Sequence, residues 1–232
     1  MRNLLILSSL FVFAVFQSGA QDVVTANRAL GPFHSINVAS GIDAELVLSK
    51  EESIEIELKG AESGQMITEV EDGILSVRMR TGSYKNATLK VRIHFKELKG
   101  IEATGRAEVW SQEDLYEDNL DIKLFNGGAT RLTLYCDNLS VNLSQGSILT
   151  LRGEGKEADL KVNTNATYNG YEFKCENVIV NATSTGKAKV SVSNTLTASA
   201  STGGFVGFVG NPKRVERNVS LRGEITETFL DE

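Results

Sequence analysis

The feature that most constrains the fold is a turn phrase that recurs along the chain at a nearly fixed spacing. In each copy an apolar residue precedes a cluster of small, polar or glycine residues, and a short alternating segment follows. The last five copies begin at Leu124, Leu143, Val162, Ala182 and Ala200, so the steps are 19, 19, 20 and 18 residues. A fixed period of this kind is the signature of coils stacked one on the next. The phrase therefore predicts a repetitive scaffold and argues against a single buried catalytic pocket.

Alternation of apolar and polar residues predicts strands along the whole chain. In the first half it covers residues 35–38, 44–48, 54–58, 74–79 and 89–95. From residue 98 onward each repeat contains a short strand, a small-residue turn and a second short strand, and residues 219–225 are predicted to form one last strand. We predict an all-β protein built as a right-handed parallel β-helix or solenoid-like stack of short strands. An ordinary β-sandwich is the alternative.

The N-terminal twenty residues have the pattern of a secretory signal peptide. Arg2 precedes an apolar run over residues 4–16, and the small residues Ser18 and Ala20 precede a cleavage site before Gln21. A membrane anchor is the alternative. The predicted organisation is a signal peptide at 1–20, a linker at 21–30, one β-solenoid domain at 31–226 and a tail at 227–232. We expect an exported chain without membrane insertion, located in the periplasm, at the outer cell surface or in the medium.

The charge pattern narrows the range of partners. The formal net charge is −6, which disfavours nucleic acid and anionic membrane surfaces because both select basic patches. Residues 31–119 are the more charged part, whereas 120–210 carry the clearer repeats. Residues 177–211 contain only Lys187 and Lys189 as charged residues. This segment is predicted either to close the end of the stack, through Phe205, Phe208 and the turn at 210–212, or to bind a neutral partner.

The two cysteines, Cys136 and Cys175, lie 39 residues apart, which is close to two repeat periods. Neighbouring strands are about 4.8 Å apart, so cysteines two coils apart have Cα atoms about 9–10 Å apart. A disulfide needs a Cα separation below about 7 Å. Export permits a bridge, but this geometry favours two separate thiols.

These phrases resemble the putative auto-transporter adhesin family with a head GIN domain, known from secreted proteins of Bacteroidetes-type bacteria. The resemblance rests on residues 31–46, 71–75, 98–105 and 210–212 together with the repeated Ser/Thr-Gly turns, and it extends over roughly 30–226. It implies a right-handed β-helix similar in shape to pectin-lyase-type folds, with a suggested role in cell adhesion. It implies no catalytic residues, because the shared motifs are turns.

Residues that could carry chemistry are few. The chain has only two histidines, His34 and His94, which excludes a multi-histidine zinc site and leaves little for a Ser-His-Asp triad. We predict no catalytic residues, no cofactor and no resident metal. One acidic and aromatic group is a candidate surface for a weakly bound sugar or calcium ion: Trp110, Glu113, Asp114, Tyr116, Glu117 and Asp118. A solvated loop between two coils is the alternative, and the one that we favour.

The functional hypothesis is an exported, non-enzymatic β-solenoid that contacts glycans or other cell-surface components through repeated rungs. One alternative is a lyase or glycosidase with a groove along the solenoid. Another is a purely structural periplasmic domain. Carboxylates around a concave, aromatic-lined groove would favour the enzyme, whereas a flat Ser/Thr/Asn surface would favour adhesion.

Overall fold

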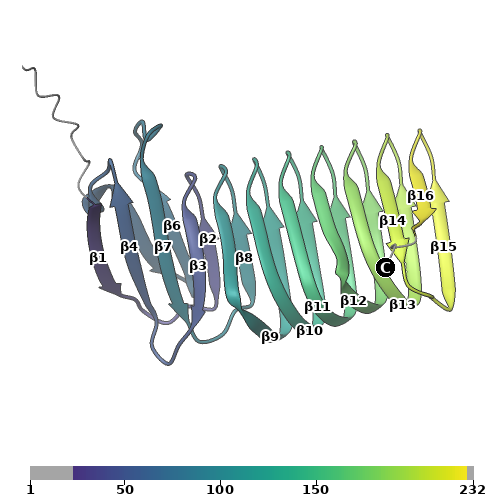
Figure 1. The fold of residues 1–232 in the computed structure, drawn as a ribbon, viewed down its shortest axis with the longest axis horizontal. Helices are drawn as coiled ribbons and strands as arrows, with labels where there is room; N and C mark the ends of the chain where they lie inside the picture. The colour runs from purple at the N-terminus through teal and green to yellow at the C-terminus, as the bar shows by residue number, and fades with distance from the viewer. Residues whose placement is uncertain (1–22, 229–232) are drawn as a thin grey trace, which may run out of the picture.

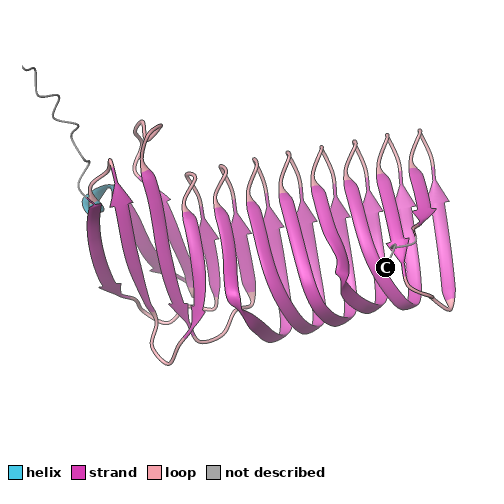
Figure 2. Ribbon diagram, in the orientation of Figure 1, coloured by secondary structure: helices cyan, strands magenta, loops and turns pink. Residues whose placement is uncertain are grey.

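The computed structural model describes residues 23–228, so the predicted signal peptide and residues 229–232 of the predicted tail lie outside the described part (Figure 1). Within it the chain is built almost entirely of strands, with one 3₁₀ turn, η1 (Ser63–Gln65) (Figure 2). The strands are β1 (Val23–Ala29), β2 (Ser35–Val38), β3 (Asp43–Leu48), β4 (Ser53–Lys59), β5 (Met66–Glu71), β6 (Ile74–Met79), β7 (Thr88–Phe95), β8 (Gly100–Ala103), β9 (Glu108–Leu124), β10 (Ala129–Leu143), β11 (Ile148–Val162), β12 (Thr167–Ala182), β13 (Lys187–Ala200), β14 (Phe205–Val209), β15 (Arg214–Val219) and β16 (Glu224–Glu227).

The molecule is a β-solenoid in which each long strand bends midway and contributes to two sheets. The first part of β9 pairs with β3, whereas its last four residues pair with β8. We call face A the sheet made by β1, β4, β7, β3, the first parts of β9 to β13, β14 and β16. Face B is the sheet made by β5, β6, β2, β8, the second parts of β9 to β13, and β15. Tight turns join the faces along one edge, and strand bends join them along the other, which we call the bend edge (Figures 1 and 2).

The sequence repeat corresponds to the rungs of face B. Leu124, Leu143, Val162, Ala182 and Ala200 are consecutive partners in register, each at the end of its strand. The uneven steps of 20 and 18 residues arise from register shifts in face A and at the bend, between Thr150 and Arg152 and between Gly170 and Asn177. Face B stays in register because these irregularities absorb the differences in coil length.

The core is a continuous column between the two faces. One row of it consists of Ile122, Val141, Leu160, Val180 and Ala198, which are partners on successive rungs and at most 1% exposed. A single coil has no partner for its apolar side, so each rung is stabilised mainly by its neighbours. The all-β solenoid prediction is confirmed.

The N-terminal part does not add coils in sequence order. β2 and β3 are inserted between β6/β7 and β8/β9, so the first coil of the chain is an inner rung of the stack (Figure 1). β4 pairs antiparallel with β7, and β1 pairs antiparallel with β4 over all seven residues. The linker predicted at 21–30 is therefore wrong for Val23–Ala29, which is the outermost strand of face A. Antiparallel strands at this end limit further parallel stacking.

The C-terminal end differs from the prediction for residues 177–211. β15 and β16 lie beyond this segment, so Phe205, Phe208 and the turn at 210–212 do not close the stack. Phe208 is buried in the core, and the guanidinium of Arg217 lies over its ring at 5.0 Å. The single strand predicted at 219–225 is also wrong, because a tight turn separates β15 from β16.

The cysteines follow the prediction. Cys136 and Cys175 are both free and buried. Gly155 is the register partner of both, so one rung lies between them. Their spacing along the stack explains why no bridge forms.

Candidate functional site

All six residues of the predicted acidic and aromatic surface lie on β9, but the strand bends and divides them among different surroundings. Trp110, Glu113 and Asp114 lie on the face A part, and Tyr116 follows shortly before the bend. Glu117 and Asp118 occupy the bend edge. The six residues therefore do not form one site.

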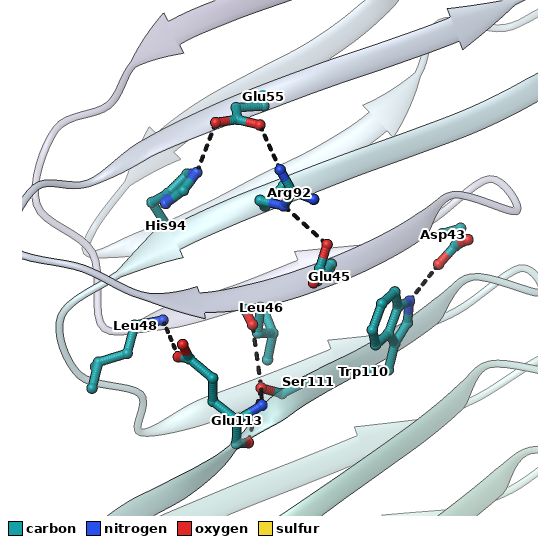
Figure 3. A network of polar contacts seen from close by, with 10 residues as sticks. All are labelled: Asp43, Glu45, Leu46, Leu48, Glu55, Arg92, His94, Trp110, Ser111 and Glu113. Carbon is teal, nitrogen blue, oxygen red and sulfur yellow. Dashed lines mark hydrogen bonds and ion pairs between the residues drawn. The ribbon is translucent and has the colours of Figure 1, made fainter.

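Trp110 belongs to a polar network on face A (Figure 3). Its indole Nε1 donates a hydrogen bond of 2.6 Å to Asp43 on β3. Arg92 on β7 bridges the carboxylates of Glu45 at 2.9 Å and Glu55 at 3.0 Å. These residues line a shallow hollow of about 380 Å³, and their mutual contacts tie β3, β4, β7 and β9 together.

Glu113 has a local structural role. Its carboxylate accepts a hydrogen bond of 3.2 Å from the backbone N–H of Leu48, and the Ser111 hydroxyl donates to the carbonyl of Leu46 at 3.2 Å (Figure 3). These bonds join β9 to β3 at the irregular part of β9. Asp114 is exposed beside Thr133 of the next rung.

Tyr116 stacks on an aromatic residue that is not part of the predicted surface. Its ring stacks on that of Tyr135, its register partner on β10, with centroids 4.9 Å apart and ring planes 8° apart. Tyr116 is 70% exposed. The two rings form an aromatic ridge on face A next to the bend edge.

A groove of about 530 Å³ lies on the face B side of the bend edge, and we call it the axial groove. Between its walls runs the row Leu120, Leu139 and Ala158, on successive rungs, whose side chains point into the core and are at most 5% exposed. It reaches from Lys99, next to β8, to Ile179 on β12. This path crosses five rungs, or about 19 Å at about 4.8 Å per step.

Polar rows form the two walls of the axial groove. One row is Asn119, Asn138 and Glu157, and the other is Asp121, Ser140 and Asp159. Asn138 Nδ2 donates to Asn119 Oδ1 at 3.0 Å, and Ser140 Oγ donates to Asp121 Oδ1 at 3.1 Å. Asn177 Nδ2 donates to Glu157 Oε1 at 2.8 Å. These bonds along the stack hold the wall side chains in fixed positions.

The axial groove is strongly acidic. Six carboxylates and one ammonium group line it: Glu97, Glu117, Asp118, Asp121, Glu157, Asp159 and Lys99. Burial raises the pKa of the Glu117 carboxyl, and the neighbouring charges of Glu97 and Asp118 raise it further. The backbone N–H of Leu98 donates to Glu117 at 2.9 Å and opposes this effect.

Of the residues that line the axial groove, only Glu117 and Asp118 belong to the surface predicted from the sequence. The signal was present as side chains 19 residues apart, such as Asn119 with Asn138 and Asp121 with Ser140. It could not be used without knowing where each coil bends. Among residues 23–228, no group of three or more His, Cys, Asp or Glu side chains is placed to hold a metal ion. The same residues include no helix with the length and apolarity needed to span a membrane.

Stacked parallel rungs, with an open groove along them, define the class of this protein as a β-solenoid. The chain belongs to the family described as "Putative auto-transporter adhesin, head GIN domain", whose model matches residues 32–212. The resemblance inferred from the turn phrases is thus confirmed. A search of curated proteins gives no match.

Solved structures share the fold. A putative adhesin of Bacteroides fragilis has a TM-score of 0.82 at 18% identity, covering 89% of this chain and 97% of that one. A putative adhesin of Parabacteroides merdae has a TM-score of 0.74 at 19% identity, covering 89% and 96%. A putative lipid binding protein of Parabacteroides distasonis has a TM-score of 0.68 at 16% identity, covering 90% and 97%. Similarity at these identities shows the fold alone.

Proposed function

We propose that this protein is an exported, non-enzymatic adhesin that binds an extended, uncharged glycan along the axial groove. The observation that carries the proposal is the groove itself, with two polar walls repeated on successive rungs and the exposed Ile179 at one end. Membership of an adhesin-type family supports a binding role.

The groove has the chemistry that a sugar chain requires. The side chain of Ile179, which is 59% exposed, offers apolar surface to the C–H groups of a pyranose ring. The amide and carboxylate rows supply the acceptors and donors that hydroxyl groups need. Because the same groups recur at each rung, many weak contacts add along one chain.

Charge sets the class of glycan. Six carboxylates against one lysine repel sulfated or uronic-acid chains, so the groove favours glycans without acidic groups. Because most of these carboxylates are exposed, added salt should screen the repulsion.

Three of the six groove carboxylates have structural partners within the chain, which favours a binding role over acid–base catalysis. Glu117 accepts from Leu98, Glu157 accepts from Asn177, and Asp121 pairs with Lys123 at 2.5 Å. The aromatic pair Tyr116 and Tyr135 lies outside the axial groove. The pKa of Glu117 is raised, as is that of the catalytic acid in many glycosidases. The test below therefore also measures cleavage of the glycan.

The test combines a glycan array with calorimetry of the mature protein and neutral oligosaccharides of four to six residues. Ser140→Arg places a long side chain at the centre of the groove, and Ile148→Arg adds the same charge to face A. We expect binding that Ser140→Arg weakens by at least about tenfold, through lost contacts and occlusion, and that Ile148→Arg leaves unchanged. Depolymerisation of a bound glycan, or equal effects of the two variants, would contradict the proposal.

A further inference from the structure

A second surface, on face A near the C-terminal end, has the opposite charge to the axial groove. We call it the terminal platform, made by Tyr171, Lys187, Lys189, Phe205 and Gly207. Lys187 and Lys189 are the only charged residues in 177–211. Both belong to the outward-facing positions of β13, and about 7 Å separates such alternate residues.

The rungs on either side of the two lysines are uncharged at the matching positions. Lys187 lies between Thr167 on β12 and Phe205 on β14. Lys189 lies between Asn169 and Gly207. A chain with a net charge of −6 thus has a small basic surface with no acidic residue at the flanking positions 167, 169, 205 and 207.

Neither lysine forms an ion pair with a carboxylate of residues 23–228. Nearby acidic residues are engaged elsewhere. Glu172 pairs with Arg152 at 2.9 Å. Glu224, which is the partner of Phe205 on the next rung, accepts a hydrogen bond of 2.9 Å from Thr226. Both ammonium groups are therefore available to an external anion.

Tyr171 supplies an aromatic surface beside these charges. It emerges from the irregular stretch of β12, where the register with β13 shifts between Gly170 and Lys174. Its hydroxyl hydrogen-bonds to Thr228 Oγ1 at 3.2 Å, and the Lys189 ammonium lies 5.9 Å from the ring centroid. The side chain thus extends along face A across β13.

Gly207 makes room for this arrangement. A Cβ at position 207 would lie 2.5 Å from the Tyr171 hydroxyl and 3.0 Å from the Phe205 ring. The glycine is buried although it occupies an outward-facing position, because the two aromatic side chains cover it. The rings are held in place before any ligand arrives, which lowers the entropy cost of binding.

We infer that the terminal platform binds a glycan that contains sugar acids. The carboxylate of a uronic acid would pair with Lys187 and Lys189, and its ring would pack on Tyr171 and Phe205. Amphipathic aromatic surface next to cations suits a ligand with both an apolar ring face and a negative charge. The site does not depend on the proposed function, since it lies on the other sheet and selects the opposite charge.

The test measures binding of oligogalacturonate to the mature protein by calorimetry, with neutral galactose oligomers and polyglutamate as comparison ligands. The double variant Lys187→Gln/Lys189→Gln removes both charges, and Lys161→Gln removes one from an exposed position on face B. Tyr171→Ala removes the ring, whereas Gly207→Ala displaces it. Thermal unfolding checks that each variant is folded.

We expect the double lysine variant and Tyr171→Ala each to weaken oligogalacturonate binding by about tenfold. Gly207→Ala should weaken it less, and Lys161→Gln should have no effect. Binding should also fall as salt is added. Loss of affinity in Lys161→Gln equal to that of the double variant would overturn the inference. So would polyglutamate binding as tight as that of oligogalacturonate, or absence of oligogalacturonate binding. Failure here would leave neutral glycan binding in the axial groove unaffected, because Ser140→Arg probes a separate surface.

Discussion

The ring of Tyr168 occupies the space that a side chain at Gly170 would need. A Cβ built at position 170 would lie 2.4 Å from the ring, and Tyr168 is only 1% exposed. Similar relationships join Gly155 with Phe173, at 2.7 Å. Large aromatic rings thus fill the core at places where a neighbouring glycine has no side chain. The irregular part of β12 can therefore accommodate these rings only if the neighbouring positions remain glycine.

Gly170→Ala should therefore destabilise the protein. The clash involves the hydroxyl end of a buried ring, which has no free space to move into, so we expect a loss of about 2–3 kcal/mol in the free energy of unfolding. Urea denaturation monitored by circular dichroism would measure it. Gly31→Ala is the matched control, because nothing lies within 4 Å of a Cβ at that position. Equal midpoints for the two variants would show that the ring relocates at little cost.

The two cysteines should resist thiol reagents in the native state. Burial raises the pKa of Cys136 from 9.0 to about 11 and that of Cys175 to about 12. At pH 8 the reactive thiolate fraction of Cys136 is about 100-fold lower than for a free thiol. We expect no labelling by a chromogenic disulfide reagent in buffer and two equivalents in urea. Fast labelling of the folded protein would contradict the buried arrangement.

The same shifts predict how stability depends on alkaline pH. The folded protein holds the two thiol protons more tightly than the unfolded chain, so this contribution to stability is complete below about pH 9, the ordinary value for these groups. It is lost as the pH rises through the folded values. Cys136→Ala/Cys175→Ala should therefore show a flatter decline of the free energy of unfolding between pH 9 and 11 than the parent protein. If the free energy of unfolding of the two proteins declines in parallel over this pH range, the buried thiols do not contribute to the pH dependence.

Glu117 provides a prediction in the acidic groove. Burial raises its carboxyl pKa above the usual 4.5, so the ionised form opposes folding. Its favourable contribution is present below the unfolded pKa and is lost as pH rises through the folded one. Glu117→Gln keeps an acceptor for Leu98 and should raise Tm by a few degrees at pH 7, with no gain at pH 3.5. Glu176→Gln, at an exposed position, is the control. A Tm gain that is independent of pH would argue against this explanation.

The sequence predicts the fold well only where small residues or glycine identify the turns. The anchors from Leu124 to Ala200 were found because small residues or glycine follow each of them and face B keeps its register. The last turn was missed because Leu221 and Arg222 adopt φ angles of 45° and 64°, which large side chains rarely take. The order of β2 and β3 was also not predictable, since no local pattern encodes pairing with strands far along the chain.

The candidate site was predictable only in fragments. Glu117 and Asp118 stand out as acidic neighbours, but their groove partners Asn138 and Asp159 come from later coils. Tyr171 gave no signal at all, because its position depends on a register shift in β12 and on the missing side chain of Gly207. To predict which residues of different coils lie together, one must know at which residue each coil bends. The periodicity of the sequence does not give that position.

The end of the stack gives the last prediction. Arg217 is the register partner of Ala198, so it continues an inward-facing core row, and its guanidinium covers the Phe208 ring. An inward-pointing charge on an edge strand hinders pairing with another molecule. Arg217→Leu should extend the apolar core to the open end and cause self-association at micromolar concentration, which light scattering after gel filtration would detect. Arg214→Leu removes the same charge from the outward side of β15 and should leave the protein in its original state. If both variants associate equally, the effect comes from lost surface charge and not from the position of Arg217 over the core.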